Sequence, residues 1–205
     1  MKKLAIIFAF CLATTSVFAQ STTARTGIRG GFSASNLRIK EYTERNPLYG
    51  FHVSAFTQIP VITDFLYIQP EVGYTNKGTR ATFNVAGFEN ESKFKLNYVE
   101  VPVLATFKIG DFVDIHAGPY FGYLLKAAAE NKNNIAGSSS TLLDTDNFKR
   151  FDYVVGAGLT LYFGKFLIST RYNLGLQKVA DSFVAQQVLG NAKNTSAQLS
   201  VGVTL

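Results

Sequence analysis

The two histidines, His52 and His116, are where a search for chemistry in this chain begins. Imidazole is the side chain best suited to act as a general base near neutral pH, and it is also a common metal ligand. A hydrolase would need a nucleophile beside one of them and a third group that orients the imidazole. A zinc site would need more than two histidines, so carboxylates such as Asp114 would have to join them.

Both histidines fall on the polar side of alternating segments, and these two segments are not expected to be neighbours. We therefore interpret them as interior side chains and predict no catalytic residue, no metal and no cofactor. Gly156 and Gly158 do not indicate a nucleotide loop, because no helix follows them. A lipid-modifying membrane enzyme that uses His52 or His116 remains an alternative.

Charged residues share this polar side, and they are the candidate site of the chain. An isolated buried charge is costly, so we expect them to form an internal ion-pair network with a structural role. Which pairs touch stays open at this point. The set consists of Arg29, Glu71, Glu100, Asp152 and Arg171.

The overall charge of +6 comes from 20 basic and 14 acidic residues that are scattered along the chain. Nothing forms the basic stripe that a nucleic-acid-binding protein would need, so we predict no nucleic-acid partner.

Apolar and polar residues alternate with a period of two through nearly the whole chain after its amino-terminal segment. In each alternating segment one side is uncharged and rich in aliphatic and aromatic residues, while the other is small, polar or charged. Eight strands are predicted on this basis: 28–34, 49–57, 66–74, 99–107, 113–123, 153–163, 166–172 and 197–205.

The lack of a helical pattern between these segments indicates an antiparallel meander, which best avoids exposed edges by closing into a barrel. Short connections alternate with long polar ones, an asymmetry typical of outer-membrane barrels. The short connections are 60–64, 108–111 and 164–165, and the long ones are 38–48, 78–95, 127–148 and 177–194.

The predicted fold is therefore all-β: an eight-stranded antiparallel up-and-down transmembrane β-barrel, preceded by a cleaved signal peptide. Three prolines, Pro70, Pro102 and Pro119, fall inside predicted strands. Because proline removes a donor from the ladder, we expect local bulges there.

Whether the apolar side of the strands faces inward or outward distinguishes a soluble barrel from a transmembrane one. A soluble lipocalin-like barrel would turn it inward around a small apolar ligand. Aromatic residues instead cluster at both ends of the apolar side, as two lipid–water interfaces require, and charge is concentrated in the long connections. Tyrosines lie toward the long connections and phenylalanines toward the short turns: Tyr49, Tyr74, Tyr123, Tyr153, Tyr172, Phe107, Phe163 and Phe166.

The amino end has the pattern of a secretory signal. Lys2 and Lys3 precede an apolar run over 4–13, and Val17 and Ala19 supply the −3 and −1 positions of a cleavage site. We predict a signal peptide over 1–19 and a barrel domain over 20–205. The single cysteine, Cys11, lies in the signal, so the barrel domain has no disulfide.

Several segments of the chain resemble the PorT-like outer-membrane β-barrel family of Bacteroidota-type Gram-negative bacteria. The most specific element is the string of Tyr98, Glu100 and Pro102, and the similar segments are 27–37, 68–78, 96–104, 117–123 and 171–176. This resemblance implies an eight-stranded outer-membrane barrel. The family's named member is associated with a protein-secretion apparatus, a role that the resemblance does not transfer to this chain.

The sequence thus predicts an integral outer-membrane barrel with a structural, anchoring or interaction role through four long extracellular loops. The expected partners are outer-membrane lipid, the outer-membrane insertion machinery and a protein bound at these loops. The alternative function is that of an exported soluble lipocalin-like barrel.

A comparison of heated and unheated protein on a detergent gel separates these alternatives. Protein from the outer-membrane fraction should migrate differently before and after heating, because a closed membrane barrel resists unfolding by detergent until it is heated. Recovery in the soluble periplasmic fraction, with no shift on heating, would contradict the transmembrane prediction.

Overall fold

Nearly all of the described residues lie in antiparallel strands. The computed structural model describes residues 24–38, 46–85, 88–133, 137–143, 145, 148–179 and 192–205. The predicted signal peptide lies outside this part of the chain. No helix among the described residues is long and apolar enough to cross a membrane.

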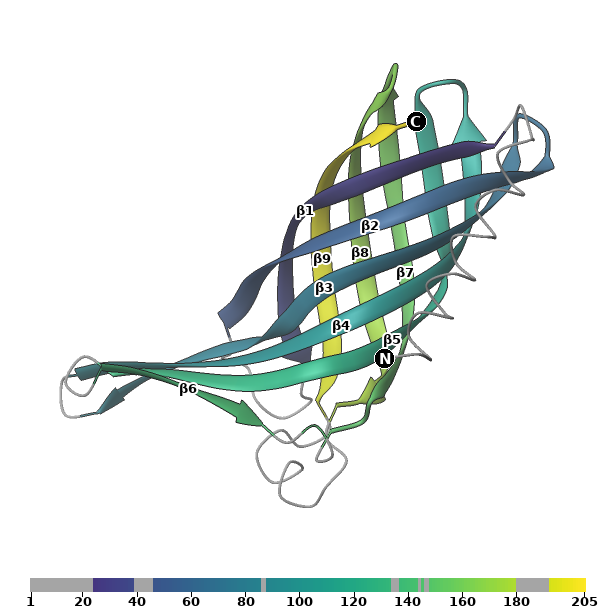
Figure 1. Ribbon diagram of the computed structural model, residues 1–205. Helices are drawn as coiled ribbons and strands as arrows, with labels where there is room; N and C mark the ends of the chain where they lie inside the picture. Colours follow the sequence, from purple (N-terminus) through teal and green to yellow (C-terminus); the bar gives the residue numbers. More distant parts are fainter. Residues whose placement is uncertain are drawn as a thin grey trace, which may run out of the picture.

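The described residues form nine strands (Figure 1). Their bounds are β1 Arg25–Arg38, β2 Asn46–Ile62, β3 Leu66–Val85, β4 Phe88–Ile109, β5 Val113–Asn133, β6 Gly137–Leu143, β7 Phe151–Phe163, β8 Phe166–Lys178 and β9 Lys193–Thr204.

Eight of these nine strands close into a barrel. Sequential strands pair from β1 to β5, β5 then pairs with β7, and β9 returns to β1, all antiparallel. The closing ladder joins Gly27 to Thr204 at one end and Arg38 to Lys193 at the other. This closure confirms the predicted eight-stranded barrel, and it leaves β6 as an added strand that pairs only with the end of β5.

The alternation of the sequence becomes an inside and an outside. Along β7 and β8 exposed and buried residues alternate almost without interruption. Phe32 is 77% exposed and Val201 is 63% exposed, whereas Thr106 and His116 on the other side are buried. The apolar side therefore faces outward, and the soluble alternative with an apolar interior is wrong.

Aromatic residues mark both margins of the outward apolar band, as predicted. Tyr74 is less exposed than the other members of the predicted set. Exposed aromatic residues at the margin near the long connections are Tyr49, Tyr123, Phe151, Tyr153 and Tyr172, and those near the short turns are Phe65, Phe107, Phe112, Phe163 and Phe166. The short turns are tight, and Gly110 and Gly164 adopt positive φ angles of 67° and 63° in them, where glycine is favoured.

Two of the four predicted long loops are largely strand. β3 continues to Val85 and β4 begins at Phe88, so 78–95 is mostly a hairpin, and β5 continues to Asn133 before pairing with β6. The sequence predicts loops here because these segments lack a continuous apolar side. Strands that project beyond a lipid band face water on both sides and need no apolar side.

The projecting part is a four-stranded sheet, here called the outer sheet. It consists of β6 and the outer parts of β3, β4 and β5, over 78–85, 88–97 and 126–133 (Figure 1). β3, β4 and β5 have 20, 22 and 21 residues, compared with 13, 13 and 12 in β7, β8 and β9. A transmembrane strand needs only about 9–11 residues.

The expected bulges at the three prolines are absent from the described ladders. Pro70 pairs with Val103, and the β3–β4 ladder resumes at Gly73 in the same register. Pro119 likewise pairs with Val155 in an unbroken β5–β7 register. The missing donor therefore interrupts the hydrogen bonds locally without adding a residue. The register shift between β4 and β5 lies instead at Asn97/Tyr98.

A charge placed on the outward band tests this assignment of faces. Val101→Arg should lower the free energy of unfolding in lipid by about 2–4 kcal/mol, because it places a guanidinium near the middle of the bilayer. Thr141→Arg, at an exposed position of β6, is the matched control and should change stability little. The measurement is urea unfolding followed by gel mobility, and equal tolerance of both variants would contradict the assignment.

Candidate functional site

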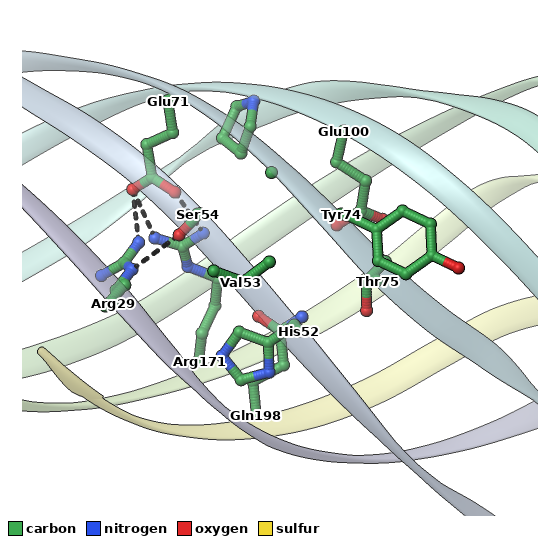
Figure 2. Close-up of a pocket in the computed structure, with 12 residues that line it drawn as sticks. Arg29, His52, Val53, Ser54, Glu71, Tyr74, Thr75, Glu100, Arg171 and Gln198 are labelled. Carbon is green, nitrogen blue, oxygen red and sulfur yellow. Dashed lines mark hydrogen bonds and ion pairs between the residues drawn. The ribbon is translucent and has the colours of Figure 1, made fainter.

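In the interior of the barrel one carboxylate lies between two guanidinium groups. Glu71 on β3 receives hydrogen bonds from Arg171 on β8, with Nη1 3.0 Å from Oε2 and Nη2 2.7 Å from Oε1. Arg29 on β1 also pairs through Nη2 with Glu71 Oε1. All three side chains are buried, and Figure 2 shows them converging across the barrel.

Neutral donors and acceptors complete the coordination of these charges. Arg29 Nη1 lies 3.2 Å from Ser169 Oγ and its Nε lies 3.3 Å from Ser54 Oγ. Gln69 donates to Glu71 Oε1 at 2.5 Å. A buried ion pair is stable only when such further hydrogen bonds satisfy the remaining atoms, and here they do.

The polar network continues from Gln69 toward the short-turn end. Gln58 Nε2 lies 2.8 Å from Gln69 Oε1 and 2.7 Å from Asp114 Oδ2. Below this layer Phe56, Tyr162 and Leu167 form a small apolar cluster. Asp114 thus belongs to a layer of amides rather than to a metal site with the histidines.

Glu100 pairs with a lysine that the sequence analysis did not select. Lys77 Nζ lies 2.5 Å from Glu100 Oε1, and it lies 5.5 Å from the ring centroids of both Tyr98 and Tyr120. The side chain of Lys77 is buried although it lies near the end of the predicted strand. The signal was present, since the inward alternation through Gln69 and Glu71 continues without a break to position 77.

Asp152, the fifth predicted residue, lies away from both arginines in the hydrogen-bond network. Its Oδ2 accepts a hydrogen bond of 2.7 Å from Asn194 Nδ2, which also lies 3.4 Å from the Tyr98 hydroxyl. The structure therefore brings Arg29, Glu71 and Arg171 together, while Glu100 and Asp152 belong to a second group nearer the long connections.

The two histidines bond separate partners. His52 Nε2 lies 2.7 Å from Ser200 Oγ, and His116 Nε2 accepts a hydrogen bond of 3.3 Å from Arg171 Nε. Within the described part of the chain, His52 Nδ1 has no hydrogen-bond partner, so no third group orients the His52–Ser200 pair. The described residues also contain no group of three side chains suited to a metal ion.

The middle of the interior is filled by side chains, and a depression of about 350 Å³ opens beside Gln58 and Tyr67 at the short-turn end. The small cavity beside Arg29, His52 and Glu71 in Figure 2 measures about 20 Å³, which is room for about one water molecule. At the end near the long connections, buried apolar side chains pack together inside the barrel. It consists of Leu96, Tyr98, Leu124, Ala127, Phe148, Val179 and Ala192, with Phe94 and Leu143 packed against it.

This combination of a lipid-compatible exterior and a packed polar interior defines an integral membrane β-barrel. A family model described as the outer membrane protein beta-barrel domain matches residues 18–181. The chain therefore belongs to the outer membrane protein beta-barrel domain family, and it is a protein of the outer membrane in contact with its lipid. A comparison with curated proteins found no match.

Solved structures with the same fold include Ail, the attachment invasion locus protein of Yersinia pestis. One Ail structure, in complex with the heparin analogue sucrose octasulfate, is similar with a TM-score of 0.54 and 17% identity, covering 90% of this chain and 100% of that one. A second Ail structure gives a TM-score of 0.50 with the same identity and coverage. Neisserial surface protein A is similar with a TM-score of 0.47 and 13% identity, over 89% of this chain and 97% of that one.

Replacement of the shared carboxylate tests the interior network. Glu71→Gln leaves two buried guanidinium groups without their counter-charge, and we expect it to lower the free energy of unfolding by about 3–5 kcal/mol. The matched control is Glu130→Gln in the half-exposed pair with Lys95, where the loss should stay below about 1 kcal/mol. Because the chain has no tryptophan, unfolding in urea is best followed by circular dichroism. A similar loss in both variants would argue against the network.

Proposed function

We propose that this outer-membrane barrel acts as a scaffold that holds the outer sheet and the neighbouring long connections outside the cell for structural, anchoring or interaction roles. The observation that carries the proposal is the difference between the membrane-spanning part of the strands and the outer sheet. The middle of the interior is occupied by its own side chains, while β3, β4 and β5 continue beyond the lipid band into the outer sheet, whose base packs on the apolar group that includes Leu96 and Phe148.

The outer sheet has the chemistry of a water-exposed recognition surface. Its β3–β4 hairpin keeps one register from Gly78↔Lys95 to Val85↔Phe88. Lys95 and Glu130 form an ion pair of 2.7 Å across neighbouring strands. Among the described strands β6 pairs only with β5, so its other edge could present backbone groups to a partner. An interaction at this end would use a preformed surface.

The absence of catalysis is part of the proposal. Ser200 and His52 are 5% and 6% exposed and face the interior, so a lipid in the bilayer does not meet the Ser200 hydroxyl. His116 is engaged by the Arg171 guanidinium. These contacts favour a structural role for both imidazoles over a lipid-modifying one. We likewise propose a structural role for the charged interior residues, which would connect the strands of the barrel to one another. These residues are Arg29, Glu71, Glu100, Asp152 and Arg171.

Two further assignments rest on the sequence. Residues 1–19 are proposed as a signal peptide and 20–205 as the barrel domain, which the outer-membrane insertion machinery would receive and close through the β1–β9 ladder. The PorT-like assignment within the broader family is supported by the string of Tyr98, Glu100 and Pro102.

Cysteine labelling of intact cells tests the proposed orientation. The barrel domain lacks cysteine, so each introduced thiol is unique after the signal is removed. Thr141→Cys on the exposed face of β6 should react with a membrane-impermeant maleimide, while Lys165→Cys in the β7–β8 turn should react only after the outer membrane is opened. Labelling of Lys165→Cys alone in intact cells would overturn the proposal.

A further inference from the structure

Basic residues form an arc along the rim of the barrel at the end of the long connections. They lie at the outer ends of neighbouring strands from β5 through β7 and β8 to β9. Four strands span roughly 15 Å of the perimeter at the usual spacing between strands. The members are Lys126, Lys149, Arg150, Lys178 and Lys193.

The register places like charges directly opposite each other in this arc. Lys193 on β9 pairs with Lys178 on β8. Like charges at opposed positions destabilise a sheet. Within the described part of the chain, no carboxylate forms an ion pair with Lys178 or Lys193. An anion bound between them would relieve this repulsion.

The arc lies on the outer wall rather than in the mouth of the barrel. Lys178 and Lys193 are exposed in the same phase of their strands as the lipid-facing residues Tyr172 and Leu199. A depression of about 310 Å³ is lined by Lys149, Arg150, Phe151, Tyr153 and Gln177, so cationic side chains and the aromatic margin share one surface. A ligand there would have an anionic head and would sit beside the apolar band.

The other rim differs in charge. At the short turns Lys108 and Lys165 are accompanied by exposed Asp64 and Asp111, which keeps that rim balanced. Among the described residues, the excess of positive charge therefore lies on the rim that faces the outer leaflet in the proposed orientation.

We propose that this arc binds the phosphate groups of the glycolipid that forms the outer leaflet. The lysines neutralise the phosphates, the aromatic margin packs against the sugar and upper acyl region, and the apolar band meets the chains. This inference rests on the proposed orientation, because only the outward rim meets that leaflet. The position on the wall favours a membrane lipid over a soluble anion, which would be expected at the mouth.

Native mass spectrometry of the purified barrel in detergent, titrated with lipid A, tests the inference. Lys178→Gln/Lys193→Gln should weaken binding about 5-fold for each lysine, and so on the order of 25-fold together, by the usual effect of a basic residue at an anionic membrane surface. Lys108→Gln/Lys165→Gln removes the same charge from the other rim and should change binding less than about twofold. Lys178→Arg/Lys193→Arg keeps the charge and should retain binding.

The chemistry of the ligand is tested by two further probes. Lipid A without its phosphates should bind the native protein as weakly as intact lipid A binds the Lys178→Gln/Lys193→Gln variant. Inorganic pyrophosphate should displace lipid A only at a large excess. Equal binding of the phosphate-free lipid, or displacement by pyrophosphate at equal concentration, would overturn the assignment to a lipid headgroup.

Failure of this inference is separable from failure of the proposed function. Each variant is first checked for the heat-dependent gel shift, which shows that the barrel has folded. If the folded Lys178→Gln/Lys193→Gln variant binds lipid A as well as the native protein does, only the proposal that the arc binds lipid phosphates is contradicted. A reversed labelling pattern of Thr141→Cys and Lys165→Cys would overturn the orientation itself.

Discussion

A chain that crosses a bilayer as strands has no water with which to satisfy its polar groups, so each must find its partner within the protein. The closed ladder from β1 through β9 meets this requirement for the backbone. Glu71 meets it for the charges, because Arg29 and Arg171 both bind its carboxylate from other strands. β1, β3 and β8 are joined through this single side chain, and the rest of the interior is arranged in layers around it.

The side chains inside the barrel are arranged in layers along its axis, whereas the outer side of the same strands faces lipid. Next to the short turns lies a small apolar cluster, followed by amides, then the arginine–glutamate centre, then the Lys77–Glu100 pair, and finally the apolar group under the long connections. Within each inward layer the side chains contact partners of the same kind, apolar with apolar and polar with polar. The outward side changes only from the aromatic margin to the aliphatic band and back to the second aromatic margin. The asymmetry that can carry recognition therefore lies beyond the band, in the outer sheet and on the rim.

Much of this arrangement was predictable from the period of two, because parity alone assigns His52, Glu71 and Arg171 to one side. Parity does not predict which inward residues meet. Arg29 and Arg171 reach Glu71 only through the stagger of the strands around the closed barrel, a property of the whole sheet. The sequence does not predict the outer sheet, because strands surrounded by water carry no apolar side. Lys77 has the inward parity of β3, but it lies beyond Tyr74, where the apolar side of the predicted strand ends; it is buried against two tyrosine rings.

The continuity of β3, β4 and β5 from the lipid band into the outer sheet has a mechanical consequence. The β3–β4 ladder runs from Leu66↔Phe107 to Val85↔Phe88 in one register, so this hairpin passes from one part to the other without a break in its pairing. A load applied to the tip along the strands acts on many backbone hydrogen bonds in shear at once, rather than opening them one after another. In the orientation proposed above, tension at the tip of the outer sheet would therefore reach the barrel through the same strands that cross the bilayer.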